Sequence, residues 1–205
     1  MKRLIYLSLL GLFLLGLGFY PTVDASNAVV GKPAPAFTLT DSNGKKHSIS
    51  DFKGKYVVLE WVNYDCPFVK KHYDSSNMQK LQKEFTDKGV VWLSINSSAT
   101  GKQGHFEPSK INALIKEKGA HPTAYLIDTD GQVGRLYGAK TTPHMYIINP
   151  NGELIYNGAI DDKASANPDD IAGSKNFVRA GLQEALAGKA VTVSASQPYG
   201  CSVKY

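Results

Sequence analysis

Two short runs of almost unbroken apolar residues constrain the fold of this chain more than any other feature. They read YVVLEWVN at 56–63 and VVWLSIN at 90–96. Runs of this kind, rich in β-branched and aromatic residues, are typical of strands that are covered on both faces. A segment with helical spacing follows each run, so the pattern predicts parallel strands at the centre of an α/β sheet.

Further elements surround these two strands. Helical spacing predicts three helices, at 76–89, 108–119 and 174–189. Turn signals predict two hairpins, around Asn43-Gly44 and Asn151-Gly152. The stretch TAYLIDTDGQV at 123–133 is interpreted as one more strand. This order predicts a mixed central sheet with an antiparallel edge, an N-terminal hairpin extension and helices on both faces.

The first residues have the features of an export signal. Lys2 and Arg3 precede an apolar run from Leu4 to Tyr20, and Val23-Asp24-Ala25 is a small-x-small cleavage site. We therefore predict a signal peptide at 1–25, one domain at 26–190, a tail at 191–205, and a periplasmic or extracellular location. The apolar run is near the lower limit of about 17 residues for spanning a bilayer, so an uncleaved membrane anchor remains an alternative.

Charge and cysteine content narrow the class of function. The chain of 205 residues carries a formal charge of +5, but its lysines are scattered among acidic residues, which argues against a nucleic-acid partner. It has two cysteines, Cys66 and Cys201. A domain of this size folds without a disulfide, so the cysteines point towards reactivity in an oxidising compartment.

Cys66 follows the first apolar run and precedes a helix. Asp65 is predicted as the N-cap and Pro67 as part of the first helical turn. The helix start then directs free N–H groups and a positive dipole at the sulfur, which favours the thiolate, and Lys70 adds positive charge. Spacing alone leaves three alternatives open: a reactive thiol, a structural disulfide and an inert buried cysteine.

Two segments carry a resemblance to a known superfamily. LEWVNYDCPFVK at 59–70 resembles the active-site segment of thioredoxin-fold proteins, and YGAKTTPH at 137–144 is similar to their stretch that ends in a cis-proline. The spacing between the two is similar to that of the redoxin and peroxiredoxin-like branch, of the alkyl hydroperoxide reductase and thiol-specific antioxidant type. The resemblance covers residues 29–187 and implies a thioredoxin-like fold.

The resemblance also implies roles for individual residues. Cys66 takes the place of the attacking cysteine, Thr142 and cis-Pro143 would bind an extended substrate, and His144 is a substrate-groove residue. Glu60 lies where thioredoxins carry a buried acid that shuttles a proton, since burial raises the pKa of a carboxylate. The alternative for Glu60 is an ion pair with a lysine at the strand edge.

The chain departs from both patterns of that superfamily. Val69 stands where thioredoxins have their second cysteine, and the residues that polarise a peroxide are mostly absent, although Asn63 could donate a hydrogen bond and Lys70 could supply charge. Cys201 in the tail could instead resolve a sulfenic acid on Cys66. The alternative is that Cys201 pairs with nothing, or with another chain.

These observations predict an exported thiol-dependent oxidoreductase without a cofactor. Cys66 would act as the nucleophile in peroxide reduction or thiol–disulfide exchange, and a thioredoxin-like protein would supply electrons. Membrane contact would occur only through an uncleaved signal. Two alternatives remain: a binding or chaperone module that has lost turnover, and a copper-handling protein that uses Cys66, His72 and His144.

Overall fold

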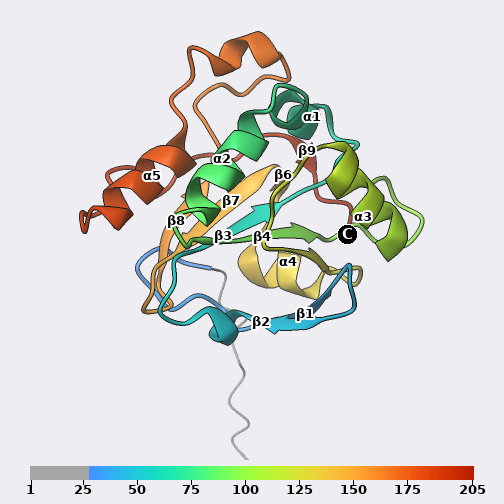
Figure 1. Cartoon of the computed structure of the whole chain (residues 1–205), viewed down its shortest axis with the longest axis horizontal. Helices are drawn as coiled ribbons and strands as arrows, with labels where there is room; N and C mark the ends of the chain where they lie inside the picture. Colours follow the sequence, from blue (N-terminus) through green and yellow to red (C-terminus); the bar gives the residue numbers. More distant parts are fainter. Residues whose placement is uncertain (1–27) are drawn as a thin grey trace, which may run out of the picture.

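A seven-stranded mixed sheet forms the centre of the molecule. The computed structural model describes residues 28–205 (Figure 1), so the predicted signal at 1–25 lies outside the described residues. The strand order is β2-β1-β5-β4-β3-β7-β8. The strands are β1 Thr38–Asp41, β2 Lys46–Ser48, β3 Val57–Trp61, β4 Val91–Asn96, β5 Ala124–Ile127, β7 His144–Ile148 and β8 Leu154–Gly158.

The two apolar runs form the central strands β3 and β4. They pair in parallel, with Leu59 opposite Leu93, and β4 also pairs in parallel with β5. On its other side β3 pairs antiparallel with β7, where Leu59 lies opposite Tyr146. Every residue of β3 and β4 is buried, as expected for strands without a solvent-facing side. The predicted hairpins are the antiparallel pairs β1–β2 and β7–β8.

Helices cover both faces of the sheet, as Figure 1 shows. One core cluster joins the sheet to the longer helices, and a second joins its other face to a short helix and the N-terminal segment. The predicted fold class is therefore confirmed. The first face carries α1 Pro67–Asp74, α2 Asn77–Thr86, α3 Pro108–Glu117 and α5 Phe177–Leu186, and the second carries α4 Gln132–Tyr137.

Helix α4 corrects the interpretation of 123–133 as one strand. The strand ends at Ile127, and the chain turns into α4 at Gln132. The reason is Asp128, whose buried carboxylate accepts hydrogen bonds from the N–H groups of Val133 (3.1 Å) and Gly134 (2.8 Å). The carboxylate thus satisfies two N–H groups that a helix start leaves free.

The tail at 191–205 lies along the domain. Ala195 forms a parallel bridge with Asn157 of β8. Farther on, strand β9 (Cys201–Ser202) pairs antiparallel with β6 (Thr141–Thr142) in a second, two-stranded sheet. Within residues 28–205, no helix has the length and apolar character needed to cross a bilayer.

Candidate active site

Cys66 is the N-cap of helix α1. Its backbone is extended (φ −72°, ψ 126°) and α1 begins at Pro67. The prediction of Asp65 as N-cap was therefore wrong by one residue. The reason is steric, since a residue directly before proline is disfavoured in the helical region and stays extended. The correction places the sulfur itself, rather than a carboxylate, at the positive end of the helix.

Asn63 builds the turn that leads to Cys66. Its backbone carbonyl accepts the Cys66 N–H at 3.0 Å, and its side-chain Oδ1 accepts the Asp65 N–H at 2.9 Å. Its amide Nδ2 donates to the Gln103 carbonyl at 3.3 Å. Both polar atoms of the Asn63 side chain are thus engaged in holding the turn.

The loop before β7 faces Cys66. The Thr142–Pro143 peptide bond is cis, which confirms that prediction. The Cys66 Sγ lies 3.1 Å from the Thr142 carbonyl oxygen, to which the protonated thiol donates. The segments 59–70 and 137–144, which are far apart in the sequence, therefore meet at this sulfur.

Cys201 lies at the same place. It is opposite Thr142 in the β6–β9 pair, so the tail brings the second thiol to the residue that Cys66 contacts. Both cysteines are free thiols, Cys66 fully buried and Cys201 partly exposed. The structure thus brings together Cys66, Cys201, Thr142 and Pro143.

The two thiols differ in acidity. Burial raises the pKa of Cys66, but hydrogen bonds from Cys201, from the Thr142 side chain and from the Val69 N–H outweigh burial, so the pKa lies below that of an ordinary cysteine. Burial, together with the hydrogen bond and charge of Cys66, raises the pKa of Cys201 to about 11. Cys66 is therefore the thiol that ionises first, while Cys201 remains its proton-bearing neighbour.

Glu60 is fully buried among neutral hydrogen-bond donors. Its carboxylate accepts from Tyr73 Oη at 2.8 Å, Trp92 Nε1 at 2.7 Å, Ser94 Oγ at 3.0 Å and Gln82 Nε2 at 3.1 Å. Burial raises the pKa of Glu60, and these hydrogen bonds offset only part of the effect. The alternative of a lysine partner is wrong, because none of these donors is a cation. Within the described residues, Glu60 makes no hydrogen bond to Cys66.

The remaining predicted residues lie apart from the sulfur. Lys70 is exposed on α1. His144 is buried on the opposite face of the sheet, where its ring packs against Tyr146 at 4.6 Å and its Nε2 bonds Asn157 Oδ1 at 2.8 Å. The copper alternative is therefore wrong about its ligand set, because Cys66 and His144 do not converge. No group of three or more His, Cys, Asp or Glu side chains suited to a metal ion occurs in residues 28–205.

Comparison with known proteins fits this site. The sequence model of the AhpC/TSA family matches residues 30–157, which include Cys66 and Pro143. The chain belongs to the AhpC/TSA family. The match ends within β8, so α5 and the tail with Cys201 lie outside the part that matches the AhpC/TSA model.

Individual relatives of this AhpC/TSA chain agree. Thiol-disulfide oxidoreductase ResA of Bacillus subtilis is 30% identical over 143 residues, which are 69% of this chain and 74% of that protein. An uncharacterised conserved protein from Geobacillus kaustophilus superposes with a TM-score of 0.74 at 28% identity, covering 86% of this chain and 92% of that one. The ResA relative, together with the family match, confirms the predicted oxidoreductase class.

A third comparison bears on the fold alone. A hypothetical protein from Sinorhizobium meliloti superposes with a TM-score of 0.73 at 22% identity, covering 88% of this chain and 96% of that one. The fold of this AhpC/TSA member thus recurs well beyond the range of close sequence similarity.

Several residues of the site were not predicted from the sequence. The donors around Glu60 come from three different elements, and Asp161 becomes a partner of Tyr199 only when the tail folds back, with the two oxygens 2.5 Å apart. One local signal was available: Gly200 directly precedes Cys201, and a glycine there permits close approach of the backbone.

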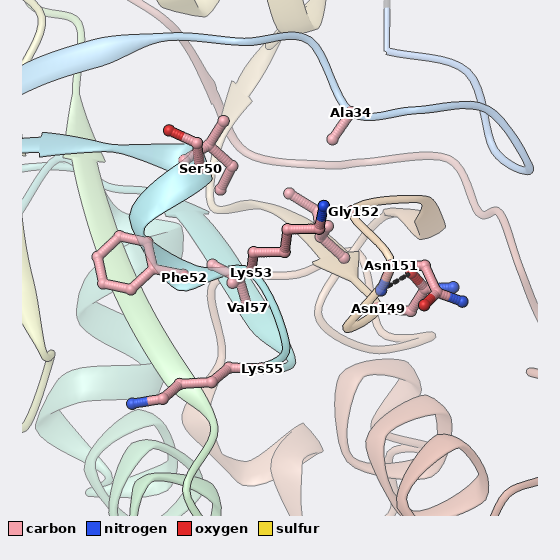
Figure 2. Close-up of a pocket in the computed structure, with 11 residues that line it drawn as sticks. Ala34, Ser50, Phe52, Lys53, Lys55, Val57, Asn149, Asn151 and Gly152 are labelled. Atoms are coloured by element: carbon pink, nitrogen blue, oxygen red, sulfur yellow. Dashed lines mark hydrogen bonds between the residues drawn. The ribbon is translucent and has the colours of Figure 1, made fainter.

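A separate pocket lies at the opposite end of β3, where Val57 begins the strand. Figure 2 shows the Lys53 side chain reaching towards Gly152 of the β7–β8 turn, while the Lys55 side chain points away from that turn. The residues that line this pocket include no cysteine, histidine or acid. The candidate chemistry of this AhpC/TSA protein therefore lies at the carboxyl end of β3, as is usual in open α/β sheets.

Proposed function

We propose that this chain is an exported thiol–disulfide oxidoreductase in which Cys66 attacks and Cys201 resolves. The observation that carries the proposal is the placement of both thiols at Thr142, with the pKa of Cys66 lowered and that of Cys201 raised. A partner protein supplies the disulfide.

The acidities suggest the order of steps. The Cys66 thiolate attacks one sulfur of the partner disulfide, forms a mixed disulfide and releases the other partner sulfur as a thiolate. Cys66 then carries no charge, so two of the causes that raise the pKa of Cys201 disappear. Cys201 gives its proton to solvent or to the partner thiolate already released, and then attacks the Cys66 sulfur. This forms the Cys66–Cys201 disulfide and releases the second partner thiolate. A thioredoxin-like protein would then reduce the pair.

Other site residues would support these steps. Asn63 holds the turn that places Cys66, and is a positioning residue in this scheme. Thr142 and Pro143 would border the bound partner. Glu60 would act as a proton store in the core, because its raised pKa allows both protonation states. Lys70 would contribute at most a screened positive field, because it is exposed.

Trapping each intermediate tests this function. The reduced chain 26–205 is mixed with oxidised glutathione, the reaction is quenched in acid, and the products are identified by mass spectrometry. We expect an intramolecular disulfide in the wild type, a Cys66–glutathione adduct in Cys201→Ala and no rapid reaction in Cys66→Ala. Equal reaction of Cys66→Ala through Cys201 would contradict the assigned order.

Peroxide reduction is a second candidate. It is favoured by the AhpC/TSA match and by Val69, which leaves Cys66 without a second cysteine on α1. The Cys66 thiolate would attack one peroxide oxygen, so that an S–O bond forms and the O–O bond breaks; Cys66 becomes a sulfenic acid and the other oxygen leaves as water or an alcohol. Cys201 would then condense with the sulfenic acid to form the disulfide and release water. Hydrogen peroxide with dimedone, on Cys201→Ala, tests for that sulfenic acid on Cys66.

Export is part of the proposal. It is supported by the signal-like sequence at 1–25 and by the stability that an oxidised thiol pair has outside the cytosol. N-terminal sequencing of the protein recovered from the producing cells tests it. We expect the chain to begin at Ser26, and retention of residues 1–25 would instead indicate a membrane anchor.

A further inference from the structure

The tail occupies the edge of β6 beside Pro143. Cys201 and Ser202 pair with this edge, and two more backbone bonds continue the contact: Val203 N–H to the Lys140 carbonyl at 3.1 Å, and Ala99 N–H to the Lys204 carbonyl at 2.8 Å. An extended partner segment that approaches Cys66 along this strand would need the same hydrogen-bonding groups. The tail therefore holds the place of such a segment.

Tyr199 anchors the tail in a buried cluster of ionisable groups. Its hydroxyl donates to Asp161 Oδ1 at 2.5 Å and lies 3.3 Å from His72 Nε2. Asp161 Oδ2 is 3.8 Å from Lys71 Nζ. Lys71, His72 and Asp161 are each at most 2% exposed. Buried charges need well-placed hydrogen bonds, and Tyr199 supplies one of them from the tail.

Gly200 sets how closely the tail approaches. A Cβ at this position would overlap the Thr142 carbonyl oxygen, and the backbone has a φ of 137° that favours glycine. Cys201 reaches the Cys66 side of β6 because Gly200 lets the two backbones come this near.

The docked tail closes the site. Cys66 is 0% exposed, and Tyr199 and Cys201 pack against the same core cluster as Cys66. A partner cannot reach the Cys66 sulfur while the tail stays in place. Opening of the tail must therefore precede any reaction of Cys66 with a second molecule.

We propose that residues 198–205 form a strap that occupies the partner's place on β6, and that the Tyr199–Asp161 contact is the latch that sets how often the strap opens. Tyr199 and Asp161 are thus positioning residues, because they hold the strap and do not touch the reacting sulfurs. Their effect on turnover rests on the proposed function. A partner segment that replaces the strap must bring a small residue to the place of Gly200, because the Thr142 carbonyl leaves no room for a side chain.

The test measures how often Cys66 becomes accessible. In the chain 26–205 with Cys201→Ala, Cys66 is the sole thiol, and its alkylation by N-ethylmaleimide is followed by mass. Rates are compared at their high-pH plateaus, so that a change in the pKa of Cys66 is not counted as opening. Tyr199→Phe keeps the ring but removes the hydrogen bond to a carboxylate, and we expect an increase of about tenfold or more. Tyr199→Ala should increase the rate further.

Tyr56→Phe is the matched control. Tyr56 packs on the same core cluster, but its hydroxyl donates to the Ala185 carbonyl of α5 at 2.8 Å and not to the Asp161 cluster that holds Tyr199. Its substitution should leave the rate unchanged. Alkylation of both Tyr199 variants at the parent rate would overturn the strap. Alkylation requires no turnover, so this test is independent of the proposed function. If the Tyr199 variants are alkylated faster but the chain with both cysteines forms no Cys66–Cys201 disulfide with oxidised glutathione, the proposed function is refuted and the strap stands.

Discussion

Glu60 and Asp161 are two buried carboxylates that both contact helix α1, and their surroundings differ. Glu60 accepts hydrogen bonds from four neutral donors, among them Tyr73 of α1. Asp161 faces Lys71 and His72 of the same helix, at 3.8 and 3.9 Å. One helix thus presents a neutral hydroxyl to one acid, and a lysine together with a buried histidine to the other.

The difference separates two tasks. In the part of the chain that the structure describes, no cation contacts Glu60; burial raises its pKa, and the group can gain or lose a proton. Asp161 instead neutralises buried positive charge and accepts the Tyr199 hydroxyl from the tail. The first arrangement suits proton exchange in the core, and the second suits a fixed anchor for the segment that carries Cys201.

Asp161→Asn should give the largest effect. The substitution leaves Lys71 buried without its counter-charge, and we expect a loss of about 3–5 kcal/mol in the free energy of unfolding. Urea unfolding at neutral pH measures this loss. Asp162→Asn is the control, because Asp162 is exposed and should change stability by less than about 0.5 kcal/mol. Equal losses in both variants would contradict a special role for Asp161.

His72 should produce the next largest effect, through pH. Burial lowers the pKa of His72 to about 4, whereas an unfolded histidine has a pKa of about 6.5. Because the unfolded state takes up the proton first, stability is lost as the pH falls from about 6.5 to about 4, by about 3 kcal/mol in total.

His72→Gln should remove that part of the slope. His144, whose pKa burial also lowers to about 4, contributes in the same direction and stays in the variant. The difference between the stability curves of the wild type and His72→Gln therefore isolates His72. If the stability of the wild type and of His72→Gln changed with pH in the same way between about pH 6.5 and pH 4, His72 would have the same pKa in the folded and the unfolded chain.

Tyr73→Phe should cost less, about 1.5–3 kcal/mol, because it removes one hydrogen bond to a buried carboxylate. Tyr64 is a matched control: its ring lies 5.0 Å from that of Tyr73, and its buried hydroxyl has no hydrogen-bond partner within residues 28–205. Tyr64→Phe should be neutral or stabilising. Thermal unfolding of the two variants compares them, and a larger loss in Tyr64→Phe would sink the assignment.

Glu60→Gln should change the pH dependence of stability, with a sign opposite to that of His72. Since burial raises the pKa of Glu60, the unfolded state releases this proton first, and stability falls as the pH rises through the raised pKa. Glu60→Gln should lack this fall, whereas exposed Glu117→Gln should follow the wild type. Stability curves from acidic to mildly alkaline pH provide the measurement.

Local sequence signals predicted the elements that depend on neighbouring residues. Strands β3 and β4 were evident because their runs are apolar throughout, and Cys66 because it stands between such a run and Pro67. The cis bond at Pro143 followed from resemblance to a family. Helix α4 was missed because it depends on a single carboxylate, Asp128, that turns the chain after β5.

The anchor of the tail could not be predicted because it depends on distant contacts. Lys71, His72 and Asp161 are ionisable residues of a kind usually found in solvent. They are buried because α1, the segment after β8 and the tail meet at one place, where Tyr199 is 38 positions from Asp161 and 127 from His72. No periodic pattern in the sequence reports a contact over such distances.

Gly200 has a consequence for how related sequences are compared. A chain that keeps both cysteines but carries a larger residue before the second one could not bring its tail against the Thr142 carbonyl. Such a chain would contain both cysteines, but their sulfurs would lie too far apart to react with each other. The glycine is therefore a stricter marker of paired thiol chemistry in such relatives than the second cysteine itself.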